Sequence, residues 1–321
     1  MPEADRSRGS IRRLFPTRNP HVRTVLRTVE KILDNDANIL LLGESGVGKD
    51  FLAEAIHRSG IRRLQPFVRI DCASIPEELF ESELFGYEKG TFTDAVDRKP
   101  GKLEMAQRGT LYFDEVGTLA PHLQAKLLRV IQENRFSRLG GSRNIDLDVR
   151  ILSSSNLPLE QLLETGALRR DLYYRLNVVS LALPPLRERR EDVPILARAF
   201  LRDAAKRYKK RITGFAPETL ALLQSHSWPG NLRELRNVID RAVILETGSA
   251  VTPESLPLET FVSASDLVSR AAERKMTLDD LEREYIREIL RQTRSNYSKA
   301  AEILGINRKT LLEKRRRYRL D

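Results

Sequence analysis

The chain has 321 residues, a length that predicts two or three globular domains, and 40% of them are hydrophobic and 31% charged. Its net charge of +10 predicts an acidic polymer as a partner. A single cysteine, Cys72, excludes an intramolecular disulfide framework and a cysteine-rich zinc site. No apolar run approaches the roughly 20 residues of a membrane span, so we expect a cytoplasmic protein without a membrane partner.

The N-terminal half of the sequence alternates between strand-like and helical patterns. Residues 1–18 are basic and contain proline, which predicts a flexible arm before a helix over residues 21–33. Five apolar runs follow, at residues 39–42, 67–70, 110–113, 149–152 and 178–181. Their alternation with helical patterns predicts a parallel sheet flanked by helices.

The C-terminal half has helical patterns only. Residues 191–247 contain no strand candidate, and the turn signal at Trp228-Pro229-Gly230 interrupts them. A polar stretch with prolines and serines then predicts a linker, and a last helical unit follows. The boundaries that we expect are 1–18 for the arm, 19–186 for the α/β part, 187–250 for a helical part, 251–276 for the linker and 277–321 for the last domain.

A glycine-rich loop follows the first predicted strand and opens a helix over residues 51–57. It consists of Gly43, Glu44, Ser45, Gly46, Val47, Gly48, Lys49 and Asp50. In this context the glycines let backbone N–H groups surround phosphates, and Lys49 reaches the β- and γ-phosphate oxygens. The loop therefore predicts ATP binding, although Asp50 stands where a general P-loop has Ser or Thr.

The strand-like run at 110–113 ends in two carboxylates, Asp114 and Glu115. Read alone, two acids at a strand end indicate a solvated turn as well as they indicate a functional site. Downstream of a P-loop, we expect Asp114 to hold Mg²⁺, through water, and Glu115 to polarise the attacking water. ATP and Mg²⁺ are therefore the expected cofactors.

Further stretches are specific to one family. They are GESGVGKD at 43–50, GYEKGTFTDA at 86–95, LQAKLLRV at 123–130, RRDLYYRLNV at 169–178 and WPGNLREL at 228–235. From about residue 19 to 320, the chain resembles bacterial enhancer-binding proteins, the AAA+ activators of RNA polymerase carrying the alternative sigma-54 factor. The resemblance implies an α/β AAA+ P-loop sheet with a helical lid, followed by an all-α helix-turn-helix domain. In this family the residue after the P-loop lysine is usually acidic, as Asp50 is.

The resemblance also implies roles for single residues outside the loop. Arg169 and Arg175 match paired arginines that reach the nucleotide of a neighbouring subunit, so that hydrolysis depends on assembly of dimers into a hexameric ring. Asn156 matches a polar sensor that faces the γ-phosphate, and Arg233 matches a second sensor on the lid.

Asp71 stands where the family usually has an asparagine that restrains the catalytic glutamate. An aspartate cannot donate a hydrogen bond to Glu115 unless it is protonated. We therefore expect the restraint to operate differently in this chain.

The stretch at 86–95 matches the family loop that contacts sigma-54, with two departures. Phe92 and Thr93 match the pair implied to touch sigma-54. Thr91 replaces an alanine, and Asp94 replaces a glycine, which adds a charge to every subunit of a ring and removes a permissive backbone. Two hypotheses remain: an activator that remodels sigma-54 RNA polymerase, or a DNA-binding regulator that keeps the fold as an oligomer switch without engaging sigma-54.

The last domain resembles the Fis-type helix-turn-helix that ends this family, which implies enhancer DNA as a partner. The residues that we expect to contact DNA are Asn307, Arg308, Lys309, Thr310, Lys314 and Arg315. A basic run alone is usually a solvated face, but the glycine-centred turn and the Asn307 cap favour DNA binding. An apolar spacing at Leu278, Leu281, Tyr285 and Ile289 predicts the helix that packs a dimer.

Family members often carry an N-terminal receiver or ligand-sensing domain. Only about twenty residues precede the predicted ATPase here. Two alternatives follow: a natural short form of the family that is controlled by a separate regulatory protein, or a piece of a longer chain. Met1 and the basic arm favour the first.

Overall fold

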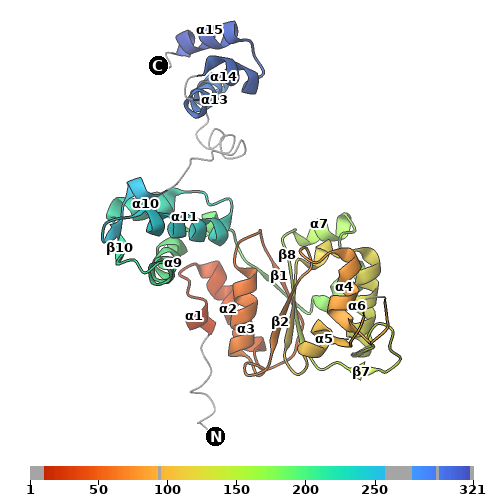
Figure 1. Ribbon diagram of the computed structural model, residues 1–321. Helices are drawn as coiled ribbons and strands as arrows, with labels where there is room; N and C mark the ends of the chain where they lie inside the picture. Colours follow the sequence, from red (N-terminus) through yellow and green to blue (C-terminus); the bar gives the residue numbers. More distant parts are fainter. Residues whose placement is uncertain (1–10, 93–94, 257–276, 294–295, 319–321) are drawn as a thin grey trace. The chain divides into compact units, whose positions relative to one another are not determined.

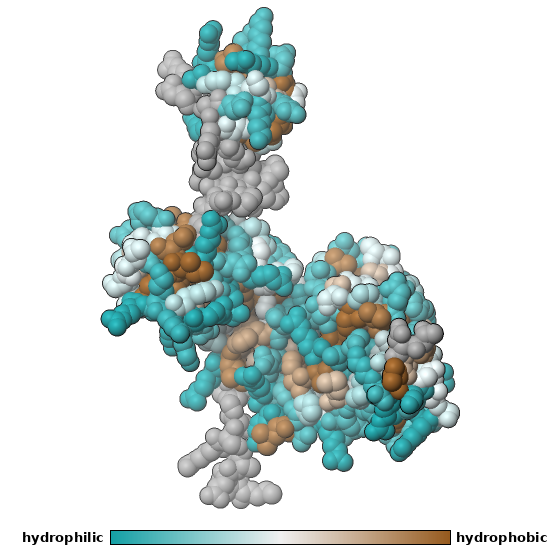
Figure 2. All heavy atoms as spheres, in the orientation of Figure 1, coloured by the Kyte–Doolittle hydropathy of each residue, from teal (hydrophilic) through white to brown (hydrophobic). Residues whose placement is uncertain are grey.

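The computed structural model describes residues 11–92, 95–256, 277–293 and 296–318 (Figure 1). The chain forms two compact units, Met1–Pro257 and Leu258–Asp321, which are described separately below. Figure 2 shows a mainly hydrophilic face on both units, interrupted by apolar patches. None of the helices in the described ranges is both long and apolar enough to cross a membrane.

The first unit is built on a parallel sheet whose strand order is β2-β5-β8-β1-β9. The strands are β1 (Ile39–Leu42), β2 (Phe67–Asp71), β5 (Thr110–Asp114), β8 (Arg150–Ser155) and β9 (Val179–Ala182). They confirm the prediction that the five apolar runs form a parallel sheet. Because all five strands run parallel, their carboxyl ends meet at one edge, where the P-loop and Asp114 lie.

Helices cover both faces of this sheet (Figure 1). One face carries α1 (Ile11–Leu14), α2 (Pro20–Ile32) and α3 (Lys49–Ser59), and the other carries α4 (Glu77–Phe85), α5 (Lys102–Met105), α6 (Pro121–Glu133), α7 (Leu159–Glu164) and α8 (Arg170–Leu176). Each layer has its own buried apolar cluster. Short 3₁₀ turns lie at Val116–Thr118, Leu186–Glu188, Arg190–Asp192 and Pro253–Ser255.

The prediction of a flexible arm over residues 1–18 is wrong for its described part. Ile11 and Phe15 are 1% and 4% exposed and join the core beside α2 and α3. The Thr17 hydroxyl donates to Asp192 at 2.6 Å, which fixes the segment against the start of α9 (Val193–Arg207). The basic composition concealed an apolar i, i+4 pair that is sufficient to dock one helical turn. Residues 1–10 lie outside the described residues.

The helical lid contains α9, α10 (Pro217–Ser225) and α11 (Asn231–Leu245). Trp228 is fully buried there, and its Nε1 donates to the Leu223 carbonyl at 2.8 Å, as expected for core packing. The lid also has a parallel pair, β10 (Gly214–Phe215) with β11 (Ala250–Val251), where the sequence predicted no strand. Val251 is buried, so the predicted linker does not begin at residue 251; residues 257–276 of that linker lie outside the described residues.

The described part of the second unit contains α13 (Leu278–Gln292), α14 (Tyr297–Ile303) and α15 (Arg308–Tyr318). Its core gathers Ile286, Ile289, Leu290, Ala300, Ala301 and Leu311. The apolar residues predicted to pack a dimer therefore fall into two groups. Ile289 packs inside the unit, whereas Leu278 and Tyr285 are 85% and 43% exposed.

Candidate active site

The P-loop connects β1 to α3 and encloses the side chain of its own lysine. Lys49 is only 5% exposed, and its Nζ donates to the carbonyl oxygens of Gly43 at 2.7 Å and Glu44 at 3.2 Å. Gly46 has φ +74°, and a Cβ there would lie 2.5 Å from the Gly230 carbonyl oxygen of the lid. The loop thus has the left-handed backbone and the helix N-terminus that a phosphate cradle requires.

Glu115 lies beside this lysine. Its Oε1 is 3.6 Å from Lys49 Nζ, and its Oε2 accepts a hydrogen bond from the Asn156 backbone N–H at 3.1 Å. The Glu115 backbone N–H donates to Ser154 Oγ at 3.0 Å. Its backbone is left-handed, with φ +59° and ψ +49°, a conformation that costs a non-glycine residue about 1–3 kcal/mol and is concentrated at functional sites.

Burial lowers the pKa of Lys49, although the neighbouring Glu115 and Asp114 carboxylates oppose the shift. Burial would raise the pKa of Asp114, but hydrogen bonds from Ser154 and Tyr112 and the charge of Arg69 outweigh it and hold that pKa below its ordinary value. Asp114 therefore stays ionised, which suits an acceptor of metal-bound water.

Asp114 is held by three side chains. Ser154 Oγ donates to its Oδ1 at 2.6 Å, and Tyr112 donates to the same oxygen at 2.9 Å. Arg69, on β2, donates to Oδ2. The guanidinium of Arg69 also lies 3.4 Å from Asp50 Oδ2.

Sequence reasoning missed Arg69. The available signal was a basic residue near the carboxyl end of an apolar strand-like run, in FVRID, where the sheets of such proteins bind ligands.

Asp71 and Asn156 lie at the same edge of the sheet. Asp71 is in register with Asp114, and its Oδ1 accepts from the Ala73 N–H at 3.2 Å. The contacts of the Glu115 side chain instead come from Lys49 and the Asn156 backbone. The Asn156 side chain is exposed.

The lid contacts the P-loop directly. Arg233 Nη1 donates to Ser45 Oγ at 2.9 Å, so the predicted second sensor contacts the P-loop. Asn231 donates to Glu44 Oε2 and to the Ser45 carbonyl, both at 3.1 Å. The Leu232 backbone N–H donates to the Gly46 carbonyl at 2.9 Å.

Two arginines just after the sheet also hold this loop, and sequence reasoning missed both. Arg187 pairs bidentately with Glu44 at 2.6 and 2.9 Å. Arg189 is 1% exposed and donates to the Val47 carbonyl at 2.6 Å; burial lowers its pKa to about 10. Their role depends on tertiary packing, because each contacts a loop residue more than 140 positions earlier in the chain.

The structure does not bring Arg169 and Arg175 to the P-loop of their own chain. Arg169 pairs with Asp171 at 2.7 Å. Arg175 Nη2 donates to the Ile131 carbonyl at 3.3 Å, and its own carbonyl accepts from Asn38. Asn38 precedes β1, whereas the P-loop follows β1, so Arg175 lies at the opposite end of that strand.

The Phe92 loop rises from the hairpin of β3 (Gly86–Tyr87) with β4 (Lys99–Pro100). Phe92 is 44% exposed, and its ring packs edge-on against Tyr87 with centroids 4.7 Å apart. Thr93 and Asp94, which the sequence places beside it, lie outside the described residues.

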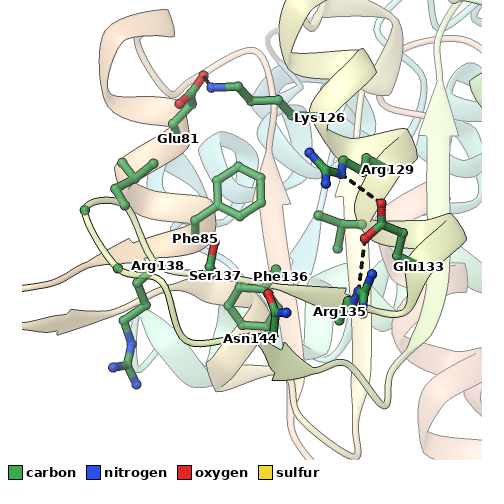
Figure 3. Close-up of a pocket in the computed structure, with 14 residues that line it drawn as sticks. Glu81, Phe85, Lys126, Arg129, Glu133, Arg135, Phe136, Ser137, Arg138 and Asn144 are labelled. Atoms are coloured by element: carbon green, nitrogen blue, oxygen red, sulfur yellow. Dashed lines mark hydrogen bonds and ion pairs between the residues drawn. The ribbon is translucent and has the colours of Figure 1, made fainter.

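A second hairpin, β6 (Arg135–Phe136) with β7 (Ile145–Asp146), supports this loop. Arg138 donates to Glu88 at 2.6 Å and also to Glu104. Beneath the hairpin lies a cavity of about 390 Å³ whose rim carries mostly paired charges (Figure 3). Glu133 there accepts from both Arg129 and Arg135.

In the second unit, Asn307 Oδ1 accepts from the Thr310 N–H at 2.8 Å, so it caps α15 as the sequence predicts. Arg308 and Lys309 are exposed beside it. Lys314 pairs with Glu282 of α13 at 2.6 Å, and Arg315 lies over the Tyr297 ring at 5.3 Å. The predicted DNA contacts therefore fall into an exposed group at the start of α15 and an internally engaged group near its end.

Comparison with protein families matches three consecutive parts of the chain. Residues 15–182 match the sigma-54 interaction domain, and residues 187–273 match the AAA+ ATPase lid domain. Residues 277–318 match the Fis family of bacterial regulatory proteins.

Individual relatives match over nearly the whole chain. Transcriptional regulatory protein ZraR of Klebsiella oxytoca is 43% identical over 296 residues, which cover 92% of this chain and 67% of ZraR. Regulatory protein AtoC of Escherichia coli strain K12 is 41% identical over 311 residues, covering 95% of this chain and 68% of AtoC. The crystal structure of NtrX from Brucella abortus in complex with ATP has a TM-score of 0.67 at 35% identity, covering 94% of this chain and 68% of NtrX.

Proposed function

Because the chain belongs to the family of sigma-54-dependent AAA+ transcriptional activators, we propose that it binds enhancer DNA, assembles into a ring and uses ATP hydrolysis to remodel sigma-54 RNA polymerase. One observation carries the enzymatic part of this proposal. Glu115 has a left-handed backbone and lies beside Lys49. Its backbone N–H is fixed by Ser154, and its carboxylate is fixed by the backbone N–H of Asn156. A residue that only ended a strand would not need this conformation.

In the proposed reaction, Lys49 binds the β- and γ-phosphates of ATP. Its Nζ must first leave the Gly43 and Glu44 carbonyls, which hold it in place of phosphate oxygens. The backbone N–H groups of the P-loop and of the first turn of α3 bind the remaining phosphate charge. NtrX, a relative with the same fold, has been crystallised in complex with ATP and with ADP, which supports this assignment.

Asp114 and Asp50 are the residues that fit Mg²⁺, since both offer carboxylate oxygens next to the phosphate cradle. Bound Mg²⁺ would neutralise charge on the β- and γ-phosphate oxygens. Glu115 then orients the attacking water and accepts its proton, while Asn156 holds the carboxylate through its backbone N–H.

Arg169 and Arg175 would complete the site of a neighbouring subunit. A guanidinium supplied in trans neutralises charge that develops on the transferring phosphoryl group, so hydrolysis depends on ring assembly. Their positions away from their own P-loop support this role.

Phe92 and Thr93 would contact sigma-54, and α15 would bind enhancer DNA through Arg308, Lys309 and Thr310. An exposed aromatic side chain is a strong anchor at a protein interface. The alternative function, a DNA-binding regulator that does not engage sigma-54, differs at this loop alone.

Transcription from a sigma-54 promoter with purified polymerase tests the proposal. Open complexes should form with ATP and not with a non-hydrolysable analogue. If the protein hydrolyses ATP but forms open complexes at none of the cognate promoters tested, the alternative function is favoured. If the assembled protein does not hydrolyse ATP, the enzymatic part of the proposal is refuted.

A further inference from the structure

Arg69 connects the two carboxylates that fit the metal ion. Its Nη2 donates to Asp114 Oδ2, and its Nη1 lies 3.4 Å from Asp50 Oδ2. These two carboxylates come from different elements, β5 and α3, and a guanidinium lies between them. The inference below rests on the proposed nucleotide site.

A guanidinium and a hydrated divalent cation compete for the same oxygens. Arg69 carries one positive charge in a planar group that bridges two acceptors, whereas Mg²⁺ carries two and requires octahedral oxygen ligands. Both cannot contact Asp114 Oδ2 closely at once, because Asp114 is only 13% exposed and its Oδ1 is already occupied by Ser154 and Tyr112.

Arg69 is also able to leave. It lies on β2, one of the two edge strands of the sheet, and its side chain is 43% exposed. An arginine on an edge strand can rotate into solvent without breaking the core. The contact with Asp114 is therefore replaceable, unlike the buried contacts of Ser154 and Tyr112.

We propose that Arg69 is a built-in competitor of the divalent metal ion: it bridges Asp50 and Asp114 when no metal is present and is displaced from Asp114 when metal binds with the nucleotide. Arg69 thereby lowers the affinity of the nucleotide-bound site for metal. It also limits the repulsion among Asp50, Asp114 and Glu115 in the nucleotide-free protein.

The test is a Mn²⁺ titration, followed by electron paramagnetic resonance, of the 321-residue chain saturated with ADP. Arg69→Ser should bind Mn²⁺ about three- to tenfold more tightly than wild type. Arg69→Lys keeps the charge but loses the planar bridge, so its affinity should fall between the two. Arg58→Ser, which removes an equal charge from an exposed pair with Glu54 on α3, is the matched control and should bind Mn²⁺ as wild type does.

A parallel titration with a fluorescent ADP analogue in EDTA separates the possible outcomes. Arg69→Ser should bind this analogue as wild type does. Equal Mn²⁺ affinities for wild type and Arg69→Ser would overturn the inference alone, and so would loss of metal-free nucleotide binding in Arg69→Ser, since Arg69 would then contact phosphate. Failure of wild type to bind ADP at all would overturn the proposed function, and this inference with it.

Discussion

The Thr91 hydroxyl lies 3.0 Å from the carbonyl oxygen of Leu139, and this contact ties the Phe92 loop to the β6–β7 hairpin. The same hydroxyl also lies 2.6 Å from the Glu88 carbonyl, so its single proton is shared between two acceptors. Backbone bonds from Glu88 to Leu139 and from Leu139 to Gly86 reinforce the connection. The residue that departs from the family pattern thus has a definite partner in a second loop.

Removing this hydroxyl should loosen the Phe92 loop. Thr91→Val keeps the side-chain volume but loses a hydrogen bond worth about 0.5–1.5 kcal/mol, so we expect affinity for sigma-54 to change about two- to tenfold with ATP hydrolysis retained. Thr91→Ser keeps the hydroxyl and should match wild type. Identical sigma-54 affinities for all three proteins, measured with a transition-state analogue of ATP, would show that the contact does not position the loop.

Phe92 is expected to be the anchor for sigma-54. Phe92→Ala should reduce sigma-54 binding by several kcal/mol and leave basal ATP hydrolysis intact, because the loop is distinct from the P-loop. Tyr87→Leu, which removes the ring beneath Phe92, should have a smaller effect in the same direction. Normal pull-down of sigma-54 by Phe92→Ala would make the loop assignment wrong.

Lys49 and Glu115 should separate binding from turnover. Lys49→Ala should weaken ATP binding at least about tenfold, since it removes a ground-state phosphate contact. Glu115→Gln should bind ATP and lower turnover on the order of 10²–10⁴-fold, because it removes the base. Calorimetric binding and steady-state hydrolysis measure the two effects, and full turnover by Glu115→Gln would contradict the role of this residue.

Glu246 provides a test at acidic pH. Hydrogen bonds from Ser255 and from the backbone N–H groups of Gly248, Thr252 and Thr247 lower its pKa to about 2. Because the folded pKa lies below the unfolded value of about 4.3, its stabilisation is complete above about pH 5 and is lost as the pH falls towards 2. The difference in urea midpoint between wild type and Glu246→Gln should therefore shrink from pH 7 to pH 3; a constant difference would mean that ionisation is not its cause.

The two groups of basic residues on α15 should contribute unequally to DNA binding. Lys309→Ala should weaken binding to duplex DNA about tenfold and reduce the steepness of the salt dependence by about one. Lys314→Ala should have a smaller effect, because Lys314 already pairs with Glu282. Fluorescence anisotropy at several salt concentrations measures both, and a larger effect of Lys314→Ala would reverse this order.

The sequence was sufficient for features that are contiguous in the chain. The five strands form uninterrupted apolar runs, and the P-loop and the Asp114-Glu115 pair are each read from a few adjacent residues. The docking of Ile11 and Phe15 was not predicted, since a single helical turn between basic residues has almost no periodicity. The pair β10 and β11 has two residues per strand, too few for an alternating pattern.

The parts of the site that were missed come from distant segments. Arg69, Arg187 and Asn231 reach the P-loop region from β2, the start of the lid and α11, and only the folded chain brings them there. Their residue types did not indicate a role at the site, since most arginines and asparagines are surface residues.

The backbone of Gly46 contacts the backbone of the lid, and this contact makes lid opening measurable by hydrogen exchange. The Leu232 amide is hydrogen-bonded to the Gly46 carbonyl across the contact, so its proton exchanges with deuterated solvent only when the lid leaves the P-loop. The exchange rate at this single amide therefore reports on lid opening without an attached label. It also means that Gly46→Ala disturbs two processes together, phosphate binding and lid closure, and cannot by itself be interpreted as a defect in either one.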